Sequence, residues 1–207
     1  MTGAAAEVRR KPTRAEKNAR TRAALLAAAA RIVGGSGYAA ASVAEITRDA
    51  GVALGTFYNH FDSREDLLDQ LLPDIGQQML EFVQARRQGI EDPLAEEEAG
   101  FRAFFDFLQQ RPEFYRILYE AETFAPDAFE RHVARTRDGY VRVLRRALAR
   151  RGRPLPGELE LEALSQMLLG VRHFVAMRYA RDGDGARAVP EEVIAAYMRL
   201  VRSGLGI

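Results

Sequence analysis

The segment between Gly51 and Asp66, GVALGTFYNHFDSRED, concentrates side chains that can donate hydrogen bonds within a short span. Thr56 and His60 are four residues apart, and so are Phe57 and Phe61. Because residues four apart share a helix face, the phenylalanines would face a core while the polar side chains face outward. Hydroxyl, amide and imidazole groups suit the phosphate oxygens and base edges of DNA. The alternative is an ordinary short helix with polar residues at its surface.

The elements before this segment could position it. Ser42 and Glu45 form an S-x-x-E capping box that starts a short helix, and Gly51 ends that helix after two turns. From Thr21 to Val33, apolar residues recur at the i, i+3, i+4 spacing of an amphipathic helix. Two short helices joined by a tight turn and braced by a preceding helix predict a helix-turn-helix, whose second helix enters the DNA major groove.

Helical periodicity continues along the rest of the chain, while strand-type alternation is scarce. Ser63 is an expected N-cap, and Pro73 could kink the helix that follows it. The further expected helices cover residues 54–60, 63–88, 97–110, 112–123, 127–151, 158–181 and 190–203. About nine helices without strands indicate an all-α fold with a three-helix N-terminal head.

Composition limits the class of protein. The net charge is +1, yet residues 1–64 hold 10 Lys/Arg and 5 Asp/Glu, whereas residues 65–207 hold 20 and 24. A basic N-terminal end suits a polyanion, although a solvated basic tail would look the same. The absence of cysteine and the wide separation of the three histidines argue against a metal site, and we expect no cofactor. No apolar run is long enough to span a membrane, and we expect a cytoplasmic protein without a membrane partner.

The block GYAAASVAEITRDAGVALGTFYNHFDSREDLL, residues 37–68, resembles the DNA-binding signature of the TetR family of bacterial transcriptional regulators. The resemblance covers about residues 18–70. It implies DNA contacts by Ser42, Arg48, Leu54, Thr56, Tyr58, Asn59, His60 and Arg64. The sequence departs from the family at the turn, where Ala53 and Leu54 replace a Ser and a basic or small residue. Leu54 either touches a thymine methyl group or is a spare surface leucine.

Aromatic residues are dense between residues 97 and 140. They could form an ordinary core, but in the family the corresponding helices usually surround a ligand cavity. Residues 111–132 are also similar to members that respond to fatty acyl groups, and flat aromatic compounds are the second candidates. Glu120, Glu122, His132 and His173 could orient a ligand, although a lone histidine in an apolar segment, such as His173, is more often a satisfied core residue. The expected cavity residues are Phe101, Phe104, Phe105, Leu108, Phe114, Leu118, Phe124, Phe129, His132, Tyr140, His173, Phe174 and Met177.

The last two expected helices, 158–181 and 190–203, are apolar on two faces. Such a helix is buried on both sides, so one face implies a partner. A homodimer through a four-helix bundle, as the family forms, satisfies this pattern. The expected interface residues are Leu161, Leu164, Leu168, Val171, Val175, Val193, Ile194, Tyr197 and Val201.

Together with these patterns, the resemblance to the TetR family implies a dimeric, ligand-responsive transcriptional regulator, most simply a repressor of a pseudo-palindromic operator released by a small apolar effector. We divide the chain into a basic flexible arm (1–17), a helix-turn-helix domain (18–65) and a ligand-binding and dimerisation domain (66–207). An architectural DNA-binding dimer without an effector is the main alternative. An all-α enzyme is disfavoured because the sequence lacks a cysteine nucleophile, a G-x-S-x-G segment, a phosphate-binding glycine loop and an H-E-x-x-H motif.

Overall fold

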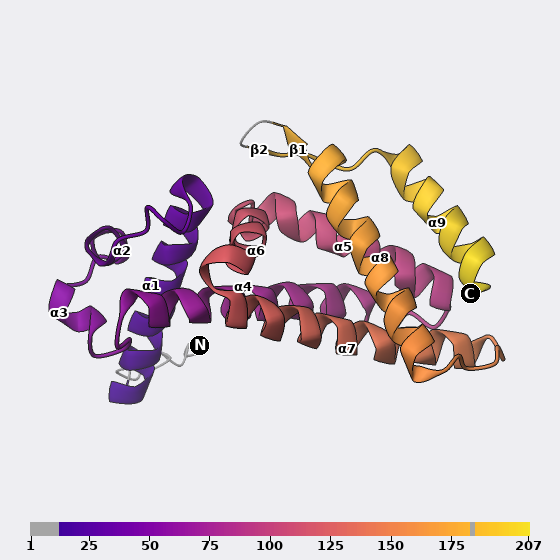
Figure 1. Cartoon of the computed structure of the whole chain (residues 1–207), viewed down its shortest axis with the longest axis horizontal. Coiled ribbons are helices and arrows are strands. Elements are labelled where there is room, and N and C mark those ends of the chain that lie inside the picture. The colour runs from indigo at the N-terminus through magenta and orange to yellow at the C-terminus, as the bar shows by residue number, and fades with distance from the viewer. Residues whose placement is uncertain (1–12, 183–184) are drawn as a thin grey trace, which may run out of the picture.

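The computed structural model describes residues 13–182 and 185–207, and within these ranges the chain folds into helices and one very short strand pair (Figure 1). The helices are α1 (Arg14–Ser36), α2 (Val43–Ala50), α3 (Leu54–Phe57), α4 (Arg64–Arg87), α5 (Pro93–Gln110), α6 (Glu113–Phe124), α7 (Pro126–Arg150), α8 (Glu158–Tyr179) and α9 (Glu191–Leu205). Strands β1 (Arg181–Asp182) and β2 (Gly185–Ala186) pair antiparallel between α8 and α9. The all-α prediction is confirmed. None of the described helices is long and apolar enough to cross a membrane.

The helices form a small head and a larger body along the long axis (Figure 1). The head contains α1, α2 and α3, and α4 leads from it into the body. There α4 packs against α5 and α7, α8 packs on α7, and α9 packs on α5. Helix α6 lies between the two parts, because it packs against α1 as well as α7. The head therefore has two connections to the body, through α4 and through α6.

Local capping explains the helices of the head. Ser42 and Glu45 form the expected capping box at the start of α2, and Gly51 ends α2 in the left-handed conformation at φ 68°. A second capping box, between Thr13 and Glu16, starts α1 at Arg14, earlier than the apolar periodicity indicated. Residues 14–17 of the expected flexible arm are thus helical, and residues 1–12 of the arm lie outside the described part.

The boundaries of the body helices also follow their caps. The Ser63 hydroxyl accepts the backbone N–H of Asp66, as predicted, and α4 continues past Pro73. Asp92 caps α5 in the same way, so this helix begins at Pro93 rather than at residue 97. Helix α3 is shorter than predicted and has no side-chain cap at its start, because Ala53 offers no acceptor.

Candidate DNA-binding head and ligand cavity

The head presents the predicted DNA-contact residues around α3, at the end of the molecule opposite α9 (Figure 1). Phe57 and Phe61 are buried, as the spacing predicted, and Phe57 contacts the neighbouring ring of Tyr58 edge-on. The Tyr58 side chain is itself 58% exposed. Exposed with it are Arg48, Leu54 and Asn59, while Ser42, Thr56, His60 and Arg64 are half-buried. This arrangement gives the head an outward polar surface over an apolar core, and the DNA contacts themselves stay predictions.

Arg64 has a structural role that the sequence did not indicate. Its guanidinium donates hydrogen bonds to the carbonyl oxygens of Tyr38 and Ala41 and forms an ion pair with Glu65 at 3.2 Å. These bonds fasten the loop before α2 to the start of α4. Arg64 therefore positions the Ser42 cap, and its expected phosphate contact would be an additional role.

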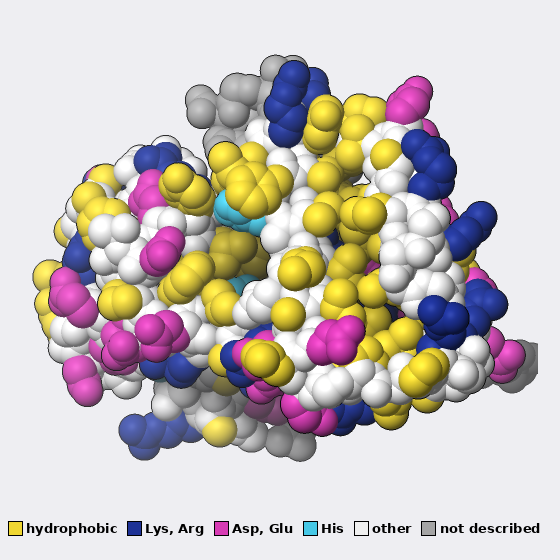
Figure 2. Space-filling view, turned by 45° about the vertical axis from the view of Figure 1, so that its right-hand side comes forward, with side chains coloured by type: hydrophobic (Ala, Val, Ile, Leu, Met, Phe, Trp, Pro, Cys, Tyr) yellow, Lys and Arg dark blue, Asp and Glu magenta, His cyan; other side chains and the backbone are white. Residues whose placement is uncertain are grey.

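A cavity of about 1100 Å³ lies in the body between α4, α5, α6, α7 and α8. Figure 2 shows a hollow in the surface of the molecule, bordered largely by hydrophobic side chains, with histidine visible inside it. Eight of the thirteen predicted cavity residues line it, which places aromatic and aliphatic walls where the sequence expected them. These eight are Phe104, Leu108, Phe114, Leu118, Phe129, His132, Tyr140 and His173.

The other five predicted cavity residues lie elsewhere. Phe101 and Phe105 are buried in the core, where Phe101 stacks on Tyr197 with ring centroids 3.9 Å apart. Phe124, Phe174 and Met177 are largely exposed on the outside of the protomer. Their assignment to the cavity was wrong, because an apolar residue on a two-faced helix can point to either side and sequence spacing does not say which.

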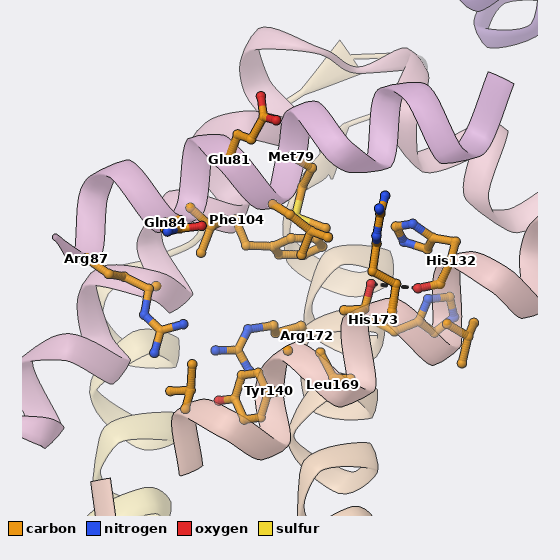
Figure 3. A pocket seen from close by; sticks show the side chains of 18 of the residues that line it. Met79, Glu81, Gln84, Arg87, Phe104, His132, Tyr140, Leu169, Arg172 and His173 are labelled. Carbon is orange, nitrogen blue, oxygen red and sulfur yellow. Dashed lines mark hydrogen bonds between the residues drawn. The ribbon is translucent and has the colours of Figure 1, made fainter. Parts of the chain in front are cut away.

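The cavity also has a polar lining that sequence analysis missed. Its members are Arg87, Glu96, Arg135, Arg142, Arg146, Arg150 and Arg172, among others. In Figure 3, Arg87 and His132 lie on opposite sides of the cavity with Phe104 between them. These charged residues come from four different helices, so no local motif joins them. The cavity is consequently apolar in one part and cationic in another.

Glu97 and Arg172 form a buried ion pair beside the cavity. The Arg172 guanidinium donates to Glu97 Oε1 at 2.6 Å, and the hydroxyls of Tyr140 and Tyr197 donate to the same oxygen at 2.5 Å each. Burial alone would raise the pKa of Glu97, but Arg172 and the two hydroxyls outweigh it and hold the pKa below its usual value. This network joins α5, α7, α8 and α9.

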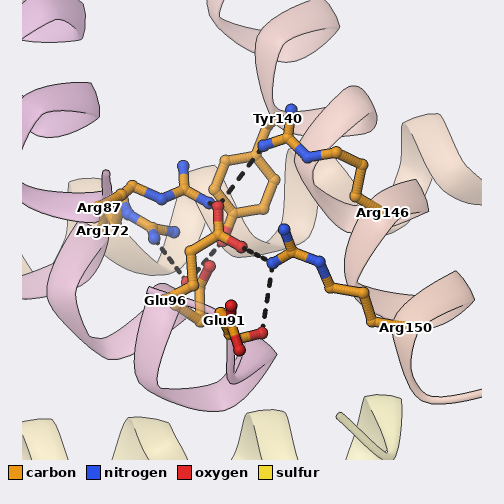
Figure 4. A network of polar contacts seen from close by, with 8 residues as sticks. Arg87, Glu91, Glu96, Tyr140, Arg146, Arg150 and Arg172 are labelled. Atoms are coloured by element: carbon orange, nitrogen blue, oxygen red, sulfur yellow. Dashed lines mark hydrogen bonds and ion pairs between the residues drawn. The ribbon is translucent and has the colours of Figure 1, made fainter. Parts of the chain in front are cut away.

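A second carboxylate, Glu96, lies among three arginines (Figure 4). Arg87 and Arg146 contact Glu96 Oε1 at 3.2 Å and 3.5 Å, and Arg150 contacts Oε2 at 3.1 Å. The Glu96 side chain is only 8% exposed, whereas those of Arg146 and Arg150 are 57% and 45% exposed. The cluster thus has one buried negative charge and more than one positive charge.

His132 lies in the cavity wall against α4. A Cβ atom at Gly76 would come within 2.3 Å of His132 Nδ1, so glycine is needed for this close approach. Burial, together with the nearby charge of Arg135, lowers the pKa of His132 to about 4. The imidazole is therefore neutral near pH 7.

Helix α6 connects the cavity to the head. Glu120 accepts the backbone N–H of Tyr38 at 2.9 Å, and Arg116 donates to the Gly35 carbonyl at 2.8 Å. A Cβ atom at Gly34 would come within 2.3 Å of the Cβ of Glu113, so α1 and α6 meet closely. Glu120 thus faces the head, contrary to its expected role in orienting a ligand, while Glu122 lines the cavity.

The faces of α8 and α9 that the sequence assigned to the dimer interface pack largely against their own protomer. Five predicted interface residues lie in the core of their own protomer, and that part of the assignment was wrong. They are Leu161, Leu168, Ile194, Tyr197 and Val201. The remaining four are half-buried, namely Leu164, Val171, Val175 and Val193. The exposed apolar stripe of α8 instead carries Leu159, Met167, Phe174 and Met177, which are 47–80% exposed.

Comparison with known proteins agrees with this arrangement. Residues 25–71 match the family model described as bacterial regulatory proteins, tetR family. The whole fold is similar to that of solved regulators of the same kind. The TetR-family transcriptional regulator PfmR from Thermus thermophilus is 21% identical with a TM-score of 0.63, over 86% of this chain and 96% of that one.

Two further solved structures cover nearly the whole chain. The fatty acid degradation regulator FadR from Bacillus halodurans is 18% identical with a TM-score of 0.70, over 95% of this chain and 98% of that one. A TetR-like transcriptional regulator from Rhodococcus is also 18% identical, with a TM-score of 0.67, over 95% and 99%. The matched residues are those of a helix-turn-helix head like that of the tetR family of regulators. The body is similar to such regulators in its fold.

Proposed function

We propose that this regulator represses transcription as a homodimer on a pseudo-palindromic operator and is released when a small apolar effector enters the cavity. Residues 18–65 are the DNA-binding unit in this proposal, and residues 66–207 bind the effector and the partner. The observation that carries it is α6, because one side of this helix lines the cavity and the other holds the head.

The exposed surface around α3 supports specific DNA binding. Tyr58 and Asn59 offer donors at the surface. In the described part of the chain, no atom lies within 4 Å of a Cβ position at Gly55, so no contact there explains this glycine. A glycine there would let the DNA backbone approach closely. Tyr58→Ala should lose about 1–3 kcal/mol of specific binding in a gel shift on the regulator's own promoter region. Tyr119→Ala, an exposed tyrosine outside the head, is the control; equal binding by both variants would reject the assignment.

The exposed stripe of α8 supports dimerisation. Met167 and Phe174 are 66% and 68% exposed, which is unusual for large apolar side chains on one helix face. Replacing both by Glu should convert a dimer to a folded monomer in analytical ultracentrifugation, because the charges would be buried without partners. Leu168→Glu on the opposite face should instead unfold the protomer. A wild-type chain that sediments as a monomer at micromolar concentration would refute this part.

Effector release follows from the position of α6. A ligand that contacts Leu118 and Glu122 would shift the helix on which Arg116 and Glu120 hold the head. A coupling of about 1–3 kcal/mol would weaken DNA binding about 5- to 150-fold, and operator DNA would weaken ligand binding equally. Calorimetry and DNA titration with each ligand class test this. Ligand binding that leaves DNA affinity unchanged would favour an architectural protein.

Fatty acyl compounds are the first effector candidates. The walls formed by Phe104, Phe114 and Phe129 are apolar, and the similar structure from Bacillus halodurans is a fatty acid degradation regulator. Flat aromatic compounds are second. Phe104→Trp should reduce the cavity volume and weaken the affinity for the active ligand class. Phe124→Trp should leave that affinity unchanged, because Phe124 is about half exposed and lies outside the cavity lining.

A further inference from the structure

The arginine cluster around Glu96 has more hydrogen-bond donors than its carboxylate can accept. Each guanidinium carries five N–H donors, while a carboxylate offers about four acceptor positions. Arg87, Arg146 and Arg150 share this one carboxylate. Within residues 13–182 and 185–207, the buried Nε of Arg87 has no hydrogen-bond partner. The cluster therefore has unused donors and excess positive charge.

The neighbouring acidic groups do not balance this charge. Glu97 is committed to Arg172, and Asp92 pairs with Arg151. Glu91 offers Arg150 its backbone carbonyl, at 3.3 Å. Arg142, which has no partner carboxylate within ion-pair distance among the described residues, also lines the cavity and adds a further positive charge. This part of the cavity would attract an anion with more than one negative charge.

We propose that Arg87, Arg146 and Arg150 form a subsite for a phosphorylated head group, with the tail of the same ligand among the aromatic walls. The inference rests on the proposed ligand-binding function. A phosphate group supplies several acceptor oxygens and up to two negative charges, and guanidinium groups bind it in a bidentate manner. Arg146 and Arg150 are half-exposed, so they can turn from Glu96 toward the ligand, while Glu96 keeps its contact with Arg87.

The position of Arg87 joins this subsite to the head. Arg87 is the last residue of α4, and α4 begins at Arg64 in the head. Its side chain crosses α5 at Gly100, where a Cβ atom would come within 3.0 Å of Arg87 Cδ and 3.2 Å of its Nε. Glycine at position 100 thus leaves room for the Arg87 side chain. A bound head group would draw together α4 and α7 at the end remote from the DNA.

Two ligand pairs test the subsite by calorimetry below their micelle concentrations. Dodecyl phosphate is compared with dodecanol, and dodecanoyl-coenzyme A with dodecanoate, so that a simple phosphate and a coenzyme A head are distinguished. In the wild type, at least one phosphorylated member should bind about 10- to 100-fold more tightly than its counterpart, as expected for added charge-assisted hydrogen bonds.

The double variant R146Q/R150Q should lose this advantage while binding dodecanol unchanged. Both side chains are half-exposed, so the fold should survive. The matched control R145Q/R151Q removes the same charge just outside the cavity and should keep the advantage. G100A should lower the advantage by displacing Arg87.

Each outcome decides the proposal. An equal affinity within both pairs, no binding of any probe, or an advantage that survives in R146Q/R150Q overturns the subsite. Tight phosphate-dependent binding that leaves DNA affinity unchanged would keep the subsite and reject effector-released repression. DNA release by uncharged compounds alone would reject the subsite and keep effector-released repression.

Discussion

The head and the body of this regulator are stabilised in different ways. In the head, α1 and α2 begin at side-chain caps such as Ser42 and pack around a core that includes Tyr38, Ile46 and Phe57. The polar side chains around α3 point outward. In the body, long helices surround a cavity and bury two carboxylates, Glu96 and Glu97, against arginines from other helices. The head therefore depends on local interactions, whereas the body depends on charge pairing over long sequence separations.

In the proposed function, the head reads DNA and must keep one geometry, which caps and a closed core provide. The body binds an effector in this proposal and must change with occupancy, and the partly exposed arginines of the cavity allow such a change. The contacts of α6 with α1 are where the two meet, so they should be sensitive to substitutions on either side.

The largest expected effect tests the dependence of the body on buried charge. Glu97→Ala should lower the free energy of unfolding by about 3–5 kcal/mol, because it leaves Arg172 buried without its partner. Glu98→Ala at the next position removes a half-exposed ion pair with Arg102 and should cost about 1 kcal/mol or less. Urea unfolding of both variants measures the difference. Similar losses at the two positions would contradict a body stabilised by buried charge.

The second prediction concerns the pH dependence of the body. His132 is neutral in the folded state down to about pH 4, whereas in the unfolded chain it takes up a proton near pH 6.5. The contribution of neutral His132 to the free energy of unfolding is therefore complete above about pH 6.5. It is lost as the pH falls toward 4, by about 1.4 kcal/mol per pH unit. His132→Gln should remove this slope from unfolding free energies measured across that range. A variant with the wild-type slope would exclude His132 as its source.

The third prediction tests the contact between head and body. Gly34→Ala should destabilise the protein by about 1–3 kcal/mol, because the new methyl group would overlap Glu113 on α6. Gly35→Ala is the control, since no atom of the described residues lies within 4 Å of its Cβ position, and it should be neutral or stabilising by up to about 1 kcal/mol. Thermal unfolding compares them. If both were neutral, α6 would not hold the head as closely as these contacts indicate.

The smallest expected effect sharpens the account of the head. Ser42→Ala should cost about 1 kcal/mol by removing the acceptor for the Glu45 N–H at the start of α2. Ser42→Asp should restore most of the stability, because a carboxylate caps equally well. Denaturant unfolding measures both. A loss much larger than this would mean that Ser42 stabilises more than its own helix.

Much of the fold could be predicted from the sequence because it is encoded locally. The capping boxes, the glycine that ends α2 and the i, i+4 pair Phe57 and Phe61 each act within a few residues, so their patterns survive in the linear chain. The N-terminal turn of α1 was missed because its residues are exposed and polar, and only the Thr13 cap marks its start.

The sequence by itself determined the helices, the helix-turn-helix head and the presence of two apolar faces on α8. Only the tertiary structure decided which face is internal. Leu168 lies in the core and Phe174 outside, although both are apolar and each belongs to a row of apolar residues at helical spacing. It also brought Arg87, Arg146 and Glu96 together from three helices. Periodicity shows that a helix has a face to bury but not its rotation against its neighbours, and charges far apart in sequence become partners only when packing sets that rotation.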